Sequence, residues 1–396
     1  MSDVYYPEQD ERQIPLGVKY DLKPVWAEIN TAFDTDATGA AIVLAAFEAF
    51  FLGRPVSYSR NWNYYGAHRH PLITYTKVTR AVDQLEAKGL IHHYRQLPGY
   101  LNWQSAFEAT TELVAMVQAI LEEKPRLRLA PLTQVTILRD AKGKPVDYRR
   151  TRAIDRQDQK TEAFNEAITS ANIALPTQSN VVALPNLACP MARIYNRDFN
   201  RGGRYYARGP SWQNTPKDNR RGVTINDEPT VELDFDGMHI AMLYARRGLP
   251  ISEDCYAIDG WPRKLAKVAT LTLINATTQR KAQESIAHNG LMSSELGVEP
   301  GSAEAKIKAT ALIKAVKARH VAIADSLHSD AGASLMRDDS DMAEIVMTEM
   351  TLRKGIIALP IHDSFLVPVS KRADLEEAMI DAAHKVTGSR LTVSEK

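Results

Sequence analysis

Two acidic residues in the second half of this sequence accompany apolar stretches, where a carboxylate can hold a metal ion. Asp234 lies near the end of the extended run 231–236, and Asp363 lies between the β-rich arms 356–361 and 365–369. A charged group is costly to bury in such surroundings unless it meets a cation. We therefore expect both carboxylates to bind a divalent metal ion. For the His362-Asp363 pair taken alone, an ordinary capped turn is the alternative.

The segment between these two stretches contains a predicted helix within 261–283 that carries two cations and an amide. Arg263 and Lys267 are four residues apart, and Asn275 follows eight residues later, so all three should point roughly one way at 3.6 residues per turn. Like charges four residues apart on a helix repel each other, which favours a shared polyanionic ligand. Two acids for metals and a cationic helix for a triphosphate are typical of nucleotidyl transfer.

The formal net charge of +1 hides an uneven distribution of charged residues along the chain. Residues 131–222 contain 16 Lys and Arg against 8 Asp and Glu, whereas residues 223–396 contain 20 against 25. A basic middle followed by an acidic part is compatible with a phosphate-binding surface beside a metal-binding one. A solvated Arg-rich face is the alternative, and charge alone does not separate the two.

Length and composition exclude several classes of protein. The 396 residues suffice for two or three domains, and the 44% hydrophobic and 24% charged residues are ordinary for a globular protein. No run of about 18 apolar residues predicts a membrane span, and the polar, acidic first residues resemble neither a signal peptide nor a transit peptide. The two cysteines, Cys189 and Cys255, are too few for a disulfide framework. We expect a cytoplasmic protein with no membrane partner.

The first 130 residues predict a small helical domain. Residues 39–53 form an apolar helix and 74–90 an amphipathic one, and the extended residues after it turn at Pro98-Gly99. Helix, loop, helix and hairpin in this order resemble a winged helix-turn-helix domain. That resemblance implies that the second helix meets nucleic acid, through Thr74, Tyr75, Thr76, Lys77, Thr79 and Arg80, with Arg95 in the wing. A structural or protein-docking role is the alternative.

Residues 131–190 predict a connecting region, which could be thumb-like. Two extended runs, 132–140 and 146–154, flank a turn at 141–144, and a helix covers 156–172. The stretch 174–190, with three prolines, reads as a linker into a last domain, 191–396. The fold class that we expect is therefore α+β.

The last domain resembles the palm and fingers of family A polymerases, which include bacterial repair-type DNA polymerases and bacteriophage-type single-subunit RNA polymerases. The matching segments stand in the family's order: Gly203-Arg204 (Thr-Gly-Arg), 212–216 (Leu-Gln-Asn-Ile-Pro), 234–239 (motif A), Arg263, Lys267 and Asn275-Ala276 (motif B), 339–356 (the helix before motif C) and 361–364 (motif C). The resemblance covers about residues 193–370 and implies the shared fold.

The resemblance also implies roles for individual residues. Asp234 and Asp363 would hold two Mg²⁺ ions, with Mn²⁺ as a possible substitute and the backbone carbonyl of Phe235 as a further ligand. Arg263 and Lys267 would clamp the triphosphate. The remaining residues would contact the incoming nucleotide (His239, Asn275), the primer–template (Arg204, Gln213, Asn214) and the primer terminus (His362). The implied partners are a DNA or RNA primer–template and nucleoside triphosphates; protein partners are unknown.

Three departures from the family bear on the product. Asn275-Ala276 stands where the family has Tyr-Gly, His239 replaces the Glu that excludes a 2′-hydroxyl in the DNA enzymes, and no segment supplies a proofreading exonuclease. We expect a small DNA-directed DNA polymerase without a proofreading domain. A single-subunit RNA polymerase, a primase or a terminal transferase is the alternative. A non-catalytic nucleic-acid-binding regulator that keeps a palm is the alternative from another class.

Overall fold

The structure is a computed structural model that describes residues 13–18, 20, 22, 25–65, 71–96, 104–122, 129–130, 132–175, 187–251 and 254–396. The chain divides into two units, and both combine helices with strands, so the expected α+β class is confirmed. Unit 1 comprises residues 1–197, 205–232 and 347–375, and unit 2 comprises 198–204, 233–346 and 376–396. The expected divisions at 130 and 190 both fall inside unit 1.

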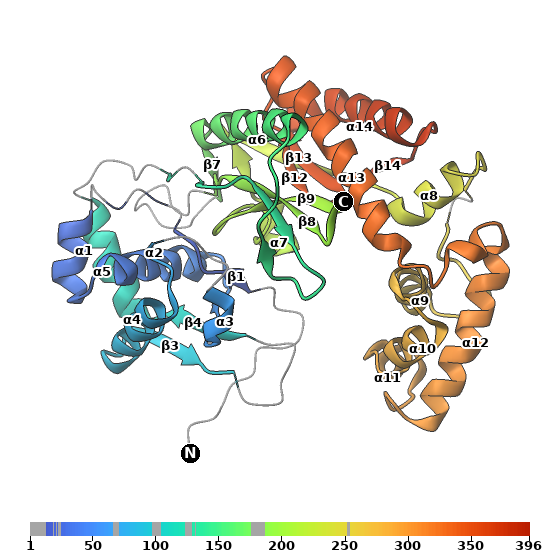
Figure 1. Cartoon of the computed structure of the whole chain (residues 1–396), viewed down its shortest axis with the longest axis horizontal. Coiled ribbons are helices and arrows are strands. Elements are labelled where there is room, and N and C mark those ends of the chain that lie inside the picture. The colour runs from blue at the N-terminus through green and yellow to red at the C-terminus, as the bar shows by residue number, and fades with distance from the viewer. Residues whose placement is uncertain are drawn as a thin grey trace. The chain divides into compact units, whose positions relative to one another are not determined.

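The first helices of unit 1 are stabilised by burial of apolar residues, which lie on one face of α4 (Tyr75–Ala87) and around nearly the whole of α2 (Ala37–Phe51). Helix α2 is buried over nearly its whole length and begins at Asp36, whose side chain accepts hydrogen bonds from two backbone amides. Helix α4 is amphipathic and buries Val78, Val82 and Leu85. Both confirm the predicted helices. Helices α1 (Trp26–Phe33), α3 (Trp62–Tyr65) and α5 (Thr111–Glu122) complete this group (Figure 1).

A four-stranded sheet accompanies these helices, with strands in the order β1-β2-β4-β3. Its strands are β1 (Ile14–Pro15), β2 (Val56–Tyr58), β3 (Ile91–Tyr94) and β4 (Ser105–Ala109). Strands β3 and β4 pair antiparallel, as expected of a hairpin, and Ile91 lies opposite Ala109. The predicted turn at Pro98-Gly99 lies outside the described residues.

The middle of the chain forms the predicted hairpin and helix. Strands β5 (Thr136–Arg139) and β6 (Pro145–Val146) pair antiparallel, and helix α6 (Arg152–Ser170) begins at Thr151, whose hydroxyl accepts a hydrogen bond from the amide of Ile154. Strands β8 (Met191–Asn196) and β9 (Asp198–Ala207) join this hairpin in the order β6-β5-β8-β9. Most of the predicted linker, residues 176–186, lies outside the described part of the chain.

A further sheet contains the strands of both stretches that the sequence associates with metal binding. Its order is β12-β13-β11-β10-β7, and β14 pairs with β11. The strands are β7 (Ile173–Ala174), β10 (Thr224–Ile225), β11 (Glu228–Phe235), β12 (Leu359–Ile361), β13 (Ser364–Pro368) and β14 (Val393–Glu395). A short helix, α7 (Lys217–Arg220), precedes β10.

Helices dominate unit 2. They are α8 (Met238–Ala245), α9 (Arg263–Asn275), α10 (Gln279–Ala287), α11 (Leu291–Leu296), α12 (Ala303–Arg319), α13 (Ala331–Met347) and most of α14 (Arg372–Thr387). Helices α9, α10 and α12 pack on one another, and α11 packs on α9 (Figure 1). A π-helical turn, Thr348–Arg353, follows α13. Within the described ranges, no helix has both the length and the apolar character needed to cross a membrane.

Candidate functional site

Asp234 lies near the end of β11, where this strand pairs with β14. The carboxylate of Asp234 faces a cation, because the Lys396 Nζ lies 2.8 Å from Asp234 Oδ2. The second acid of this segment is held differently: Asp236 Oδ1 accepts a hydrogen bond of 2.6 Å from the hydroxyl of Ser394. Strand β14 and the residue after it therefore give each of the two acids its own partner.

The donor chemistry at Asp234 fits a divalent cation. Mg²⁺ prefers carboxylate and carbonyl oxygens, and the Lys396 ammonium shows that this carboxylate already accepts a positive partner. Phe235, the expected carbonyl ligand, follows Asp234 in β11 and buries its side chain. A metal ion at Asp234 would have to displace the ammonium group of Lys396.

A glycine turns the chain from β11 into α8. Gly237 has a φ of +54°, and a Cβ atom there would lie 2.6 Å from Cys255 Sγ, so both the backbone conformation and the close approach require glycine. Two residues later, His239 lies in the first turn of α8 with its side chain 11% exposed. The turn at Gly237 therefore places Asp234 in β11 and His239 at the start of α8.

A buried carboxylate connects His239 with Arg204. The side chain of Asp339, in α13, is fully buried and receives hydrogen bonds of 2.8 and 3.1 Å from Arg204 Nε, while Arg204 Nη2 also contacts it. His239 Nε2 lies 3.5 Å from Asp339 Oδ2. A bidentate guanidinium–carboxylate pair is geometrically specific. The Arg204–Asp339–His239 cluster thus brings together two residues that the sequence implied separately.

The cations of α9 share one aromatic ring. The guanidinium carbon of Arg263 lies 5.7 Å from the centre of the Tyr256 ring, and Lys267 Nζ lies 5.6 Å from it. Both side chains are exposed, and Arg263 also donates a 2.7 Å hydrogen bond to Asp254, which lowers the pKa of that carboxyl group. The structure confirms the prediction that Arg263 and Lys267 lie on one helix face.

Asn275 lies on another side of the same helix. It lines an open pocket of about 470 Å³ between α9 and α10, together with Lys281 and Ser285. Twelve residues after Arg263, a helix has turned roughly a third of a revolution beyond whole turns. A Cβ at Gly332 would lie 1.7 Å from Asn275 Oδ1, so α13 approaches Asn275 closely. The expected common direction thus holds for the two cations, while Asn275 faces the pocket.

Asp363 lies in a two-residue turn of unit 1. Ile361 pairs with Ser364, so only His362 and Asp363 connect β12 and β13. His362 has a φ of +59°, in the left-handed region that residues other than glycine seldom adopt. Its ring lies edge-on to that of Tyr206, with 5.6 Å between the centroids. Asp363 belongs to unit 1, whereas Asp234 belongs to unit 2.

The residues expected to follow the Gly203-Arg204 motif support this hairpin. Trp212 Nε1 and Gln213 Nε2 both donate to the carbonyl oxygen of Pro360, at 2.9 and 2.8 Å. Asn214 accepts a hydrogen bond from the hydroxyl of Ser211. Gln213, which we expected to contact nucleic acid, therefore makes an intramolecular hydrogen bond that holds β12 in place, and Asn214, of which we expected the same, accepts one within its own segment.

The cations predicted on α4 differ in their availability. Lys77 is exposed, and its ammonium donates a 2.8 Å hydrogen bond to the neutral carbonyl of Pro71. Arg80 is 56% exposed and pairs with Asp36, the residue that caps α2. Lys77 is thus more available to a phosphate than Arg80.

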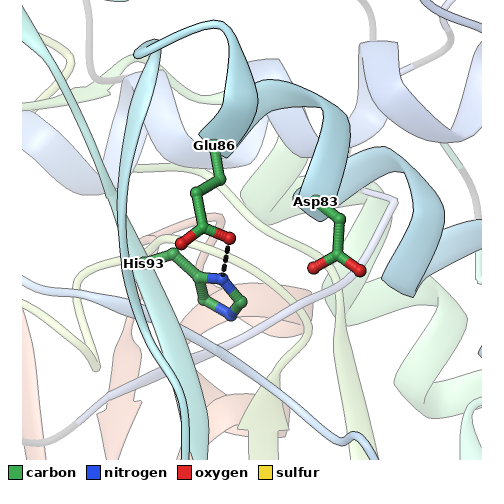
Figure 2. A group of neighbouring side chains, drawn as sticks. All are labelled: Asp83, Glu86 and His93. Carbon is green, nitrogen blue, oxygen red and sulfur yellow. Dashed lines mark hydrogen bonds and ion pairs between the residues drawn. The ribbon is translucent and has the colours of Figure 1, made fainter.

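Three further groups that could ligate a metal lie between α4 and β3. Asp83, Glu86 and His93 each offer a ligand atom, and these atoms lie within 4.8 Å of one another. Glu86 is hydrogen-bonded to the ring of His93 (Figure 2), and Glu86 Oε2 lies 2.7 Å from His93 Nδ1. Burial lowers the pKa of His93, which favours its neutral form. None of these three residues was among the predicted metal ligands.

Arginines already neutralise both carboxylates of this group. Arg60 Nη1 lies 2.7 Å from Asp83 and lowers the pKa of that carboxyl group, while Arg95 Nη2 lies 2.9 Å from Glu86. Arg95, expected to contact nucleic acid from the wing, is thus engaged within its own unit. The group forms an ion-pair network that fastens β3 to α4, and a metal ion would have to displace two guanidinium groups.

Sequence reasoning missed the roles of Asp339, Lys396 and Tyr256. Asp339 is the first residue of the predicted helix 339–356, and Met342 and Val346 follow it at helical spacing and are fully buried. That spacing places Asp339 on an apolar face and could have revealed a buried acid. Nothing in the local sequence indicates Lys396 or Tyr256, because each meets its partner through the fold.

No protein-family model matches the chain, and no curated protein is significantly similar to it. The candidate site therefore depends on its own residues and contacts.

Proposed function

We propose that this chain is a metal-dependent nucleotidyltransferase that extends the 3′ end of a nucleic acid, as a DNA-directed DNA polymerase without a proofreading domain. The observation that carries the proposal is the exposed pair of cations, Arg263 and Lys267, over the ring of Tyr256. A triphosphate concentrates negative charge within the reach of two cations one helical turn apart, and such cations stabilise charge that develops during phosphoryl transfer.

The carboxylates supply the metal-binding part of the proposal. In this proposal Asp234 in unit 2 would hold one Mg²⁺ ion, with the carbonyl of Phe235 as a further ligand, and Asp363 in unit 1 would hold a second; Mn²⁺ could substitute. When bound, such ions stabilise charge on phosphate oxygens and lower the pKa of a coordinated hydroxyl group. Support comes from the ion pair at Asp234, since a carboxylate that attracts an ammonium group also suits a divalent ion.

The remaining residues orient the substrates in this proposal. Arg263 and Lys267 bind the triphosphate, and His239 and Asn275 contact the nucleotide near its sugar. Arg204 and His362 meet the primer–template. The pairing of Arg204 with the buried Asp339 supports a positioning role, because a guanidinium bound to one carboxylate through both Nε and Nη2 keeps one orientation. The region before residue 130 binds duplex as a winged helix, chiefly through Lys77 and Arg80.

Sugar selection by bulk follows from the position of His239. Its ring is 11% exposed beside Asp339, so it has little freedom to withdraw from a 2′-hydroxyl group. Exclusion by bulk alone discriminates modestly, whereas a pocket that hydrogen-bonds a hydroxyl rejects its absence by about 10⁴ or more. His239→Gly should therefore raise incorporation of NTPs relative to dNTPs. A wild type that strongly prefers NTPs, and loses that preference in Asn275→Ala, would instead indicate an RNA polymerase.

Primer extension tests the proposal directly. A labelled primer–template is incubated with Mg²⁺ and either dNTPs or NTPs, beside a reaction without template. Asp234→Ala and Asp363→Ala should abolish incorporation while nucleic-acid binding persists. Asp381→Asn, an exposed acid on α14, is the matched control and should leave incorporation unchanged.

Each other outcome of the primer-extension assay supports a different conclusion. Incorporation above a few per cent of wild type in either alanine variant contradicts the metal assignment. Incorporation without template indicates a terminal transferase. Binding of nucleic acid with no incorporation under any condition refutes the enzyme and leaves a non-catalytic nucleic-acid-binding protein.

A further inference from the structure

Aromatic side chains gather at α3 and the start of α4 in unit 1. Trp62 is 66% exposed and Tyr64 is 37% exposed, while Tyr75 is half-buried and Tyr65 is buried. We call these four residues the aromatic platform. An indole this exposed gains little from the hydrophobic effect in the folded chain. Packing within unit 1 therefore does not explain why a tryptophan stands at position 62.

The rings of the aromatic platform support one another edge to face. The Trp62 and Tyr75 centroids are 5.4 Å apart at 62°, and those of Tyr65 and Tyr75 are 6.0 Å apart at 71°. Tyr64 and Tyr65 are 5.3 Å apart at 80°. Such arrangements are favourable between aromatic rings. The buried Tyr65, whose hydroxyl donates to the carbonyl of Ser59 at 2.6 Å, anchors the exposed rings.

The charge of this stretch complements a polyanion. Residues 54–82 contain five Lys and Arg and no Asp or Glu. Arg60 and Arg80 pair with carboxylates from outside the stretch, whereas the exposed Lys77 donates to a neutral carbonyl two residues into α4 from Tyr75. The exposed amides of Asn61 and Asn63 flank Trp62 and add hydrogen-bonding groups.

We propose that the aromatic platform binds unpaired nucleotides of a single-stranded nucleic acid. Every base has a flat face that can stack on an exposed indole or phenol ring, and cations beside the rings contact the backbone phosphates. An apolar protein surface would use the rings but would gain nothing from the exposed ammonium of Lys77 and the exposed amides of Asn61 and Asn63 near them. The proposal does not depend on the proposed polymerase activity, since it involves none of the metal or triphosphate ligands.

Fluorescence anisotropy of a labelled oligothymidylate, about 16 nucleotides long to span the usual site sizes, tests this with the full chain. Loss of one stacked base should make Trp62→Ala bind about 5-fold to 150-fold more weakly. Trp26→Ala removes a 42%-exposed indole from α1, outside the aromatic platform, and should leave the affinity unchanged. Lys77→Ala should reduce the salt slope of binding by about 0.7 if it meets one phosphate.

Two further variants keep the test decisive. Trp62→Phe retains a ring on which a base can stack, so it should bind the oligothymidylate nearly as tightly as wild type. If Trp62 had only a structural role, Trp62→Ala would lower the stability of unit 1 as well as the affinity. Asp234→Ala should bind the oligothymidylate as wild type does, even where extension is lost. Failure of the polymerase proposal can therefore be distinguished from failure of the single-strand proposal. Equal affinity of Trp62→Ala and wild type overturns the proposal. A loss confined to duplex, with single-strand binding intact, also overturns it.

Discussion

Replacing Lys396 with glutamine should tighten the binding of divalent metal at Asp234. The Lys396 ammonium lies 2.8 Å from the carboxylate, so a metal ion and this lysine compete for the same oxygen. Glutamine keeps much of the length of the side chain but removes the charge. If the proposed metal site is correct, wild type binds metal only in the fraction of molecules whose Lys396 has moved away.

The size of the effect follows from the exposure of the pair. The Lys396 and Asp234 side chains are 30% and 20% exposed, which lies between a surface pair and a buried one. Surface pairs contribute up to about 1 kcal/mol, and hydrogen bonds to charged groups about 1.5–3 kcal/mol. A pair worth about 1–2 kcal/mol should weaken the apparent metal affinity of wild type by about 5-fold to 30-fold.

Mn²⁺ binding to the protein alone measures this without any turnover, since electron paramagnetic resonance reports the free ion. Lys385→Gln, which removes an exposed lysine from α14 of the same unit, is the control. Asp234→Asn should abolish the gain in the Lys396→Gln background. Equal or weaker Mn²⁺ binding by Lys396→Gln than by Lys385→Gln would refute the competition.

Three further changes test other contacts of unit 2 by urea unfolding. Asp339→Asn should lower the free energy of unfolding by about 2–4 kcal/mol, because the buried ion pair with the largely buried Arg204 is lost; an unchanged midpoint contradicts this. Burial lowers the pKa of His320, so the unfolded chain binds more protons near pH 6 and stability should fall as the pH drops from about 7.5 to 5.5. That fall should be smaller in His320→Gln, and an equal slope would exclude His320 as its source. Gly237→Ala should destabilise by about 1–3 kcal/mol, more than Gly89→Ala, which has a similar φ but nothing within 4 Å of the new Cβ; equal losses would show that the nearby cysteine thiol yields.

Local pattern was sufficient to predict several of the elements. The expected helix at 74–90 is α4 (Tyr75–Ala87), and the expected helix at 156–172 is α6 (Arg152–Ser170). The polar pair between apolar arms at 356–369 is the two-residue turn between β12 and β13. In each case the determining signal, hydrophobic period or turn chemistry, lies within a few residues of the element.

Side-chain partnerships were less predictable because they join distant residues. Arg204 meets Asp339 across 135 positions, and only burial of the carboxylate makes the pair necessary. The joint direction of Arg263 and Lys267 was predictable from one helical turn. From Arg263 to Asn275 the helix turns about a third of a revolution beyond whole turns. For this reason Asn275 lines a separate pocket.

The way in which the two units alternate along the chain constrains how such a protein can be assembled by genetic exchange. The chain passes between the units after Arg197, Arg204, Glu232, Val346 and Leu375. A single crossover between two genes exchanges one continuous stretch, so it can replace the region that bears the aromatic platform but cannot replace unit 2 without also replacing segments of unit 1. The carboxylates and cations of the candidate site should therefore be inherited together, while the region before residue 130 is free to have a separate ancestry.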